Sequence, residues 1–312
     1  MSMRIMFMGT PDFAVPSLEA LYNKGHDICA VISQPDKPKG RGKKLVAPPV
    51  KDVAQNIGLK VYQPERIKNP DFIGLVKDVN PEMIVVVAFG QILPKDILDI
   101  PFYGCINVHA SLLPKLRGAA PINWSIINGD KTTGITTMYM DTGIDTGDMI
   151  IKKSIEINEE ENAKDLNDRL SFLGAETLID TVELISEGKA TRIKQNHEDA
   201  TYAPILTKET GKIDWSLDAI SIRNLIRGTY PWPGAYSYYD GNMFKIFTAD
   251  TLDEDVLNLD WGKIHEVNKD DFIVKCGKGY LKVKEIQFQN QKRMSVDAYL
   301  RGHSINEGIV LS

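Results

Sequence analysis

The sequence contains little cysteine, and the three cysteines present argue against two classes of protein. Cys29, Cys105 and Cys276 lie far apart and show no Cys-x-x-Cys spacing. A disulfide framework or a cysteine metal site would need paired or clustered cysteines, and this chain offers neither. We expect each thiol to pack as a small apolar side chain, in a protein of the reducing cytoplasm.

Long apolar runs, a secretory leader and excess positive charge are also missing. No segment is long and apolar enough to span a bilayer, so we expect no membrane association. With 37 Lys and Arg against 42 Asp and Glu in 312 residues, the net charge is −5. The chain as a whole is therefore not a basic nucleic-acid binder, and any such surface must be local.

The first predicted strand, turn and helix lack the glycine-rich fingerprint of dinucleotide-binding proteins. Residues 4–8 form an apolar strand pattern, followed by Gly9 and Pro11 and then by apolar residues at helical spacing. Because G-x-G-x-x-G is absent from this turn, we expect no bound NAD. The strand–turn–helix order itself is typical of a doubly wound α/β domain.

Strand and helix patterns continue to alternate up to residue 188. Residues 83–88 form a continuous apolar run typical of a buried parallel strand, and residues 162–187 predict a long amphipathic helix. The sequence therefore predicts an α/β domain over residues 1–188, with a Rossmann-like, doubly wound and mostly parallel sheet.

The remaining sequence changes character after residue 188. Residues 189–206 lose the alternation and predict a linker lying over the first domain. Residues 207–312 contain one helix pattern and several short strands separated by turn residues, which predict a small, OB-like β-barrel. Residues 275–293 are rich in Lys and Arg, a pattern that fits oligonucleotide binding and also fits lysines that protect an edge strand.

A second basic segment lies within the first domain. Residues 34–44 are rich in Pro and Gly and predict a long flexible loop. Its basic residues are Lys37, Lys39, Arg41, Lys43 and Lys44, against the single acid Asp36. Such a loop attracts phosphates, and long loops inside compact domains are often functional. The alternative is a solvated linker with incidental charge.

The chemistry is expected where the strand at residues 104–109 ends. Side chains alternate along a strand, so Asn107 and His109 share one face at its carboxyl end, where ligands bind in α/β sheets. Asp145 follows another strand and supplies a carboxylate. An amide donor, an imidazole and an acid are the parts needed for acyl transfer to an amine, although an isolated His in a strand is also a common structural residue.

No Ser or Cys is paired with a base as a nucleophile, which favours direct transfer over an acyl-enzyme. Asp141 and Asp145 each begin an Asp-Thr-Gly triplet, as in aspartic proteases. Those enzymes take one triplet from each of two β-rich lobes, whereas here the triplets are four residues apart in an α/β pattern.

Taken together, the motifs resemble the methionyl-tRNA formyltransferase family. The resemblance lies in Gly-Thr-Pro-Asp-Phe at residues 9–13, the basic segment, Asn-Val-His-Ala-Ser-Leu-Leu-Pro at 107–114, Arg-Gly-Ala-Ala-Pro-Ile at 117–122 and Met-Asp-Thr-Gly-Ile-Asp-Thr-Gly-Asp at 140–148. It extends to Ile-Asp-Trp-Ser at 213–216 and Pro-Trp-Pro at 231–233. The Ser-Leu-Leu-Pro and Asp-x-Gly motifs are shared by folate-dependent formyltransferases in general.

This resemblance implies transfer of a formyl group from 10-formyltetrahydrofolate to methionyl initiator tRNA, in translation initiation, without metal or NAD. Asn107, His109 and Asp145 match the catalytic trio, with Asn107 and protonated His109 holding the oxyanion. The folate site implied consists of Ser111, Leu112, Leu113, Pro114, Phe89, Gly90 and Ile92. The tRNA contacts implied are Lys39, Arg41, Lys43 and Lys44, and we expect a cytoplasmic monomer.

Other proteins with the same catalytic core are the alternatives. They are glycinamide ribonucleotide formyltransferase, a nucleotide-sugar amine formyltransferase and the hydrolase module of formyltetrahydrofolate dehydrogenase. The first normally lacks a second domain, and none should need the basic loop. A further alternative is a non-enzymatic RNA-binding protein, but this reading does not account for Asn107, His109 and Asp145.

Overall fold

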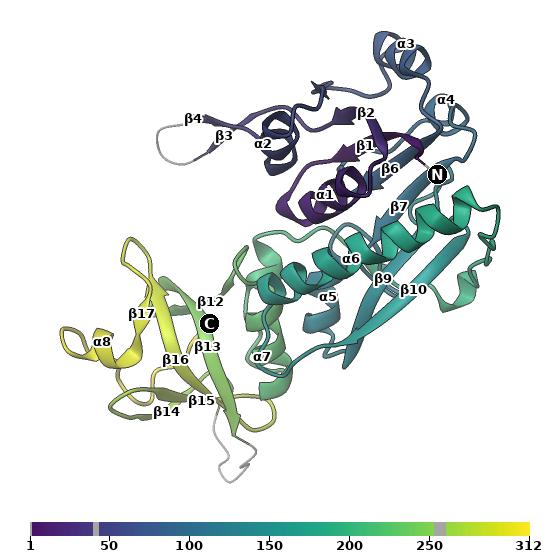
Figure 1. Cartoon of the computed structure of the whole chain (residues 1–312). Helices are drawn as coiled ribbons and strands as arrows, with labels where there is room; N and C mark the ends of the chain where they lie inside the picture. Colours follow the sequence, from purple (N-terminus) through teal and green to yellow (C-terminus); the bar gives the residue numbers. More distant parts are fainter. Residues whose placement is uncertain (1, 40–43, 253–259) are drawn as a thin grey trace. The chain divides into compact units, whose positions relative to one another are not determined.

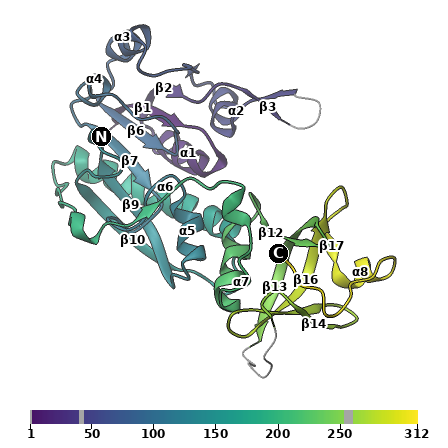
Figure 2. The same ribbon diagram turned by 180° about the vertical axis from the view of Figure 1, so that it is seen from behind.

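The computed structural model describes residues 2–39, 44–252 and 260–312, and the chain divides into two compact units. The first unit comprises Met1–Pro121, Thr132–Glu156 and Asn167–Ala203. The second is formed by residues 122–131, 157–166 and 204–312. Figures 1 and 2 label the elements from opposite sides.

The first unit is built on a seven-stranded sheet with the strand order β10-β9-β7-β6-β1-β2-β5. The five strands from β7 to β5 pair in parallel, whereas β9 is antiparallel to both β7 and β10. The strands are β1 (Arg4–Gly9), β2 (Asp27–Ile32), β5 (Val61–Tyr62), β6 (Met83–Val87), β7 (Cys105–His109), β9 (Thr132–Tyr139) and β10 (Met149–Glu156). The expected mostly parallel α/β sheet is confirmed.

Helices follow the strands in the order that the alternation predicts. They are η1 (Asp12–Ala14), α1 (Val15–Asn23), α2 (Pro49–Asn56), α3 (Pro70–Val79), α4 (Lys95–Leu98), α5 (Pro121–Ile127) and α6 (Ala163–Ser186). Proline at the first position of α2, α3 and α5 fixes where each begins, because its missing N–H is one that a helix start leaves unpaired.

Long helix α6 determines which face of β7 is free for chemistry. Gly174 of α6 lies so close to the sheet that a Cβ there would come within 3.2 Å of the Val108 side chain and 3.6 Å of Ile135. Val108 therefore faces α6. Because side chains alternate along a strand, Cys105, Asn107 and His109 face the opposite side.

That opposite face is apolar at its centre and polar at the end of β7. Cys105 belongs to a buried cluster with residues of β1, β6, α3 and α4, such as Met8, Val86 and Phe72. Burial raises the pKa of the Cys105 thiol to about 12, so it stays a neutral, apolar side chain. Cys276 is also buried, while Cys29 is only half-buried.

The basic segment differs from its prediction. Instead of a loop without secondary structure, its ends form the antiparallel pair β3 (Lys37–Lys39) and β4 (Lys44–Val46). Asp36, at the base of this hairpin, receives hydrogen bonds from Lys51 at 2.8 Å and from Gln63 at 2.8 Å. The one acid of the segment is thus neutralised locally, and the Lys51 ammonium, followed by the Gln63 amide, lowers its pKa.

The chain after α6 also contains short elements where only a linker is expected. These are η2 (His197–Asp199) and β11 (Tyr202–Ala203), and β11 pairs in parallel with β8 (Arg117–Gly118). Strands of two residues have no hydrophobic periodicity, so the sequence pattern could not reveal them.

The second unit has an antiparallel sheet in the order β12-β13-β16-β15-β14, with β17 beside β16. Helix α7 packs on it and contributes Ile222 and Ile226 to one core with Phe244, Phe272 and Leu281. The elements are η3 (Glu209–Gly211), α7 (Ala219–Gly228), β12 (Ala235–Tyr239), β13 (Asn242–Leu252), β14 (Ile264–Val267), β15 (Phe272–Lys275), β16 (Tyr280–Phe288), β17 (Met294–Ser295) and α8 (Val296–Leu300). The expected domain of short strands is confirmed as an antiparallel one.

Candidate active site

Three side chains predicted from the sequence come together beyond the end of β7. Asp145 lies in the loop between β9 and β10, and its Oδ1 atom is 3.6 Å from His109 Nδ1. Asn107 donates from Nδ2 to the same oxygen at 3.3 Å. The backbone N–H of Gly118 donates to the other carboxylate oxygen at 2.9 Å. One carboxylate therefore connects the strand end, the Asp loop and β8.

The imidazole of His109 is held from both sides. Its Nε2 atom lies 2.9 Å from the carbonyl oxygen of Leu116. A carbonyl can only accept, so Nε2 carries the proton in this contact. Nδ1 faces Asp145 at a distance longer than a hydrogen bond. A proton taken up at Nδ1 would be stabilised by the carboxylate, so the ring can act as a base at this nitrogen.

Burial makes these contacts effective. The His109 side chain is 6% exposed and that of Asp145 is 14% exposed, so little water screens their interaction. The Asn107 side chain is half-buried and open to the same space. Within the described residues, the second N–H of its amide has no acceptor, which leaves a donor for a developing negative charge.

Residues 111–114, expected to contact a folate, are largely tied into the protein. The Ser111 carbonyl oxygen accepts from the Thr136 hydroxyl at 2.7 Å, and the Leu113 N–H donates to the same hydroxyl at 3.1 Å. The Leu113 side chain is fully buried with Met138 and Met149. Ser111 is buried as well, and its hydroxyl donates to the Lys115 carbonyl oxygen at 2.6 Å.

Of this segment, only Leu112 and Pro114 are half-buried and can offer their side chains to a ligand. The Leu113 side chain is 0% exposed and offers no surface to a ligand. Its backbone carbonyl oxygen accepts from Lys152 Nζ at 3.2 Å.

Residues 89–92, which follow β6 and are also expected to contact the folate, likewise include both buried and exposed side chains. Phe89 is 2% exposed and packs in the apolar cluster beneath the site. Its carbonyl oxygen accepts from Thr10 Oγ1 at 3.2 Å and from Gln34 Nε2 at 3.3 Å. Gly90 and Ile92, by contrast, are exposed. The surface available to a ligand here is therefore that of Gly90 and Ile92, with Phe89 fixing the turn from below.

Two of the expected tRNA contacts, Lys39 and Lys44, belong to strands β3 and β4. Lys39 and Lys44 are directly opposite each other in the register of these strands. Arg41 and Lys43 lie outside the described residues.

Sequence reasoning missed a group of residues that hold the Asp145 loop. Arg117 is 2% exposed, and its guanidinium donates to Gln195 Oε1 from Nη2 at 2.7 Å and from Nε at 3.1 Å. Gln195, in the expected linker, donates to the carbonyl oxygens of Asp145 and Gly147, both at 2.8 Å. Thr201 from the same segment accepts the Leu116 N–H at 2.9 Å. The sequence does contain one indication of this group, because Arg117 is a charged residue at the start of the otherwise small and apolar stretch 117–122.

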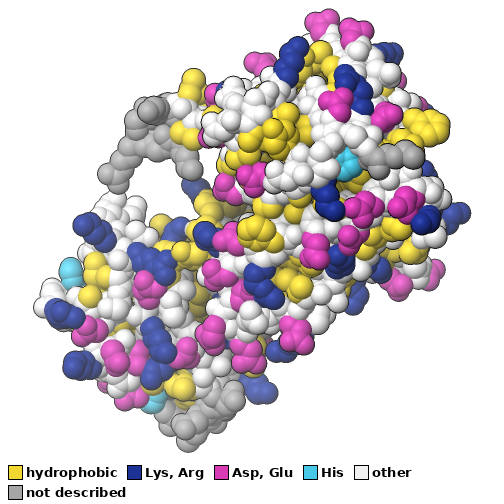
Figure 3. Space-filling model, in the orientation of Figure 1, with side chains coloured by type: hydrophobic (Ala, Val, Ile, Leu, Met, Phe, Trp, Pro, Cys, Tyr) yellow, Lys and Arg dark blue, Asp and Glu magenta, His cyan; other side chains and the backbone are white. Residues whose placement is uncertain are grey.

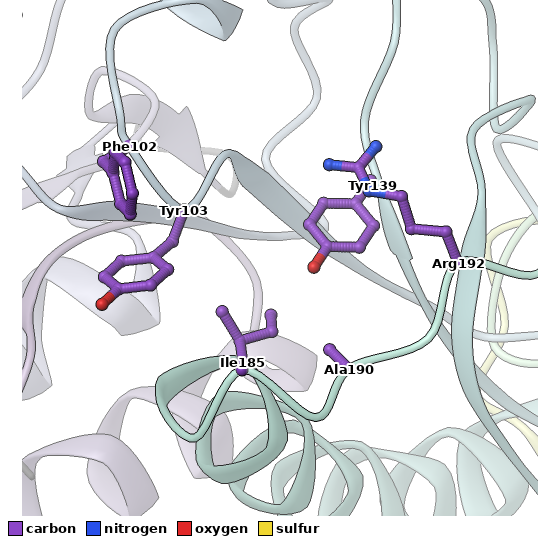
Figure 4. Close-up of a pocket in the computed structure, with 7 residues that line it drawn as sticks. Phe102, Tyr103, Tyr139, Ile185, Ala190 and Arg192 are labelled. Carbon is purple, nitrogen blue, oxygen red and sulfur yellow. The ribbon is translucent and has the colours of Figure 1, made fainter.

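A separate hollow of about 230 Å³ lies on the first unit between α6 and the start of β7. In Figure 4 the Arg192 guanidinium lies over the Tyr139 ring, with Ile185 and Ala190 below. The guanidinium carbon is 3.8 Å from the ring centroid, and Arg192 also pairs with Asp148 at 3.8 Å. Asn107, His109 and Asp145 are not among its lining residues, so this hollow is distinct from the catalytic candidate.

The described residues contain no membrane-spanning helix and no cluster of metal-ligating side chains. None of the helices there is long and apolar enough to cross a membrane. No group of three or more His, Cys, Asp or Glu side chains in the described ranges is placed to hold a metal ion.

Comparison with known proteins gives matches over both units. A family model described as formyl transferase matches residues 3–182, and one described as formyl transferase, C-terminal domain, matches residues 205–304. The methionyl-tRNA formyltransferase of Caldanaerobacter subterraneus subsp. tengcongensis is 56% identical over 310 residues, covering 99% of this chain and 100% of that protein.

Solved structures show the same fold at lower identity. The sugar 3N-formyl transferase WlaRD, solved in the presence of dTDP and 5-N-formyl-THF, matches with a TM-score of 0.69 and 20% identity, over 94% of this chain and 100% of that one. HypX from Aquifex aeolicus, in complex with tetrahydrofolic acid, matches with a TM-score of 0.65 and 15% identity, over 97% of this chain and 47% of that one.

Proposed function

The chain belongs to the methionyl-tRNA formyltransferase family, and we propose that it transfers the formyl group of 10-formyltetrahydrofolate to the α-amino group of methionyl initiator tRNA. The observation that carries the proposal is the convergence of Asn107, His109 and Asp145 beyond β7. This is the arrangement of donor, base and carboxylate that direct acyl transfer to an amine requires.

In the proposed reaction the amine nitrogen attacks the formyl carbon. The new C–N bond forms, the carbonyl oxygen becomes an oxyanion, and the bond from this carbon to N10 of the folate then breaks. The free N–H of Asn107 stabilises the oxyanion, and protonated His109 assists it. Nδ1 of His109 takes the proton from the attacking nitrogen, and the imidazolium formed in this way, stabilised by Asp145, returns it to N10 of the departing tetrahydrofolate.

The folate would bind across residues 111–114 and 89–92. The residues expected there are Ser111, Leu112, Leu113, Pro114, Phe89, Gly90 and Ile92. The more exposed residues would face the ligand, namely Leu112, Pro114, Gly90 and Ile92. The buried residues Ser111, Leu113 and Phe89 would fix the backbone.

The acceptor arm of the tRNA would lie along the basic hairpin, with Lys39, Arg41, Lys43 and Lys44 near its phosphates. The β domain would hold the outer part of the tRNA. We infer a monomer, since one chain supplies both the chemistry and the tRNA surface, and a cytoplasmic location, where translation begins.

The test is transfer of labelled formyl from 10-formyltetrahydrofolate. Charged initiator tRNA is offered beside glycinamide ribonucleotide and a nucleotide amino sugar, each at equal concentration. We expect label on the tRNA and none above background on the other two amines. Labelling of a small amine in preference to tRNA would assign the chain to a different acceptor.

A further inference from the structure

The segment that follows α6 returns to the Asp145 loop and binds it along its length. Ile193 and Met149 exchange two backbone hydrogen bonds, at 2.8 and 2.9 Å. Gln195 is 7% exposed, and its Nε2 atom donates to the carbonyl oxygens of both Asp145 and Gly147 at 2.8 Å. The loop that carries the candidate carboxylate is therefore held from outside by one buried amide.

Arg117 fixes which way this amide points. Its Nε and Nη2 atoms donate to Gln195 Oε1, and Nη2 lies 3.2 Å from His197 Nδ1. Because a guanidinium can only donate, the atom of Gln195 facing it must be the oxygen. The nitrogen must then face the two loop carbonyls. A buried arginine thus removes the usual ambiguity of a glutamine amide and sets it as a donor to the loop.

The loop needs such support at Asp145. This residue has a φ of +53°, in the left-handed region that non-glycine residues rarely adopt. A conformation of this kind costs about 1 kcal/mol or more and persists only where surrounding contacts impose it. The hydrogen bond from Gln195 ends on the Asp145 carbonyl itself. The Asp145 carboxylate in turn accepts from Gly118, the residue after Arg117, so the contacts form a closed ring.

We propose that Gln195, oriented by Arg117, is a positioning residue that holds the Asp145 carboxylate against His109 for formyl transfer. The inference rests on the proposed function and adds to it that the segment after α6 is part of the active-site architecture. Neither residue needs to touch the substrate, since both act through the backbone of the loop.

The test compares two substitutions of Gln195. Gln195→Met removes all of its hydrogen bonds and leaves the Nε atom of the buried guanidinium unsatisfied, which endangers folding. Gln195→Glu retains an acceptor for Arg117 but places a carboxylate oxygen against two carbonyl oxygens, so only the loop contacts are lost. We expect Gln195→Glu to lower kcat about 100-fold, as a displacement of about 1 Å does, while KM for the folate changes by less than about threefold.

The decisive measurement places Gln195→Glu in an Asp145→Asn background. If Gln195 acts through Asp145, the double variant will have the kcat of Asp145→Asn alone. A further loss of similar size in that background would overturn the proposal, because it would reveal a general structural role. A kcat of Gln195→Glu near that of the wild type would overturn it too.

A readout without activity is the Gly118 amide. Its N–H resonance and slow hydrogen exchange report the contact with Asp145, and we expect both to change in Gln195→Glu. Unaltered Gly118 signals would count against the proposal. Thr181→Val serves as a matched control, since it removes a buried hydrogen bond to Thr137 on the α6 face and should leave kcat and Gly118 unchanged.

The proposed function and the positioning role of Gln195 can be refuted separately. If the wild-type protein formylates no tRNA, the proposed function is wrong, while the Gly118 signals still show whether Gln195 positions Asp145. If the wild type formylates tRNA and the Gln195 variants have the same kcat as the wild type, the proposed function stands and the positioning role of Gln195 is refuted.

Discussion

His109 is the residue on which the proposed chemistry depends most. The Leu116 carbonyl oxygen occupies Nε2, so Nδ1 is the nitrogen with the looser contact, and it faces Asp145. An oxyanion or a transferring proton can therefore be handled at Nδ1 without breaking the stronger bond at Nε2. In this geometry the contact at Nε2 orients the ring, and Nδ1 is the nitrogen that can take part in the proposed chemistry.

Replacing His109 with alanine should lower kcat by about 100-fold to 10,000-fold, the usual range for loss of a general acid–base group. Formyl transfer to charged tRNA is the measurement, with thermal unfolding to show that the fold is retained. His26→Ala is the matched control, because it removes another imidazole of the first unit, one that is half-buried and lies outside the candidate site. Turnover near the wild-type value in His109→Ala would exclude His109 from the chemistry.

Single residues also show what sequence alone could predict about the site. Alternation along β7 was enough to place Asn107 and His109 on one face. The approach of Asp145 depends on a left-handed residue and on Gln195, which is 50 positions further along the chain. No local sequence pattern encodes such a contact, so Asp145 could be assigned to the site only through its Asp-x-Gly motif. Leu113 is the opposite case, since its apolar character fits a ligand surface and a core equally well.

At the scale of elements, the sequence was most informative where periodicity is strong. Strand β2 (Asp27–Ile32) and helix α3 (Pro70–Val79) follow closely from their apolar spacing and caps. The hairpin of β3 and β4 was missed, because Pro, Gly and Lys are depleted in strands and the pairing arises from chain reversal rather than from burial. The edge strand β5 has only two residues, both paired to β2, and so few residues show no periodicity.

In the second unit, one ion pair connects several elements and gives a pH prediction. Glu285 of β16 accepts from Arg293 at 2.5 and 2.8 Å, and the guanidinium lies over the rings of Phe247 and Tyr230, at 4.4 and 5.3 Å from the centroids. The hydrogen bonds from Arg293, together with the one from Thr248, lower the pKa of Glu285 from its usual 4.5. The carboxylate therefore stabilises the fold only while it is ionised.

Glu285→Gln should reduce the free energy of unfolding by roughly 1 kcal/mol at pH 7, as expected for a well-formed but partly exposed pair. Since the folded-state pKa is the lower one, the contribution is fully present above the unfolded value and is lost as the pH falls through the folded value. Denaturant titrations at pH 7 and about pH 3 should show the gap between variant and wild type closing in acid. A gap that stayed constant would mean that Glu285 acts through its shape and not its charge.

At the scale of the whole molecule, an acidic protein is proposed to bind a polyanion. On the face shown in Figure 3, Lys and Arg side chains are interspersed with Asp and Glu rather than gathered in one field. The net charge of −5 would repel tRNA at long range. Binding must then come from local clusters, and the hairpin is well suited because Lys51 neutralises its single acid, Asp36. In this proposal, the chemistry and the choice of acceptor thus reside in different segments of the chain.

If the basic hairpin binds the tRNA phosphates, the affinity for tRNA should depend on salt concentration and the binding of folate should not. With four phosphate contacts from Lys39, Arg41, Lys43 and Lys44, the affinity for tRNA should fall about 150-fold between about 50 and about 200 mM salt, whereas KM for the folate should change little. Arg41→Ala should weaken tRNA binding at every salt concentration and reduce the slope of log affinity against log salt by about one. Lys77→Ala, an exposed charge on α3, should leave the slope unchanged. A slope that is the same in Arg41→Ala and in the wild type would return the hairpin to the role of a linker, and tRNA binding would then have to come from the second unit.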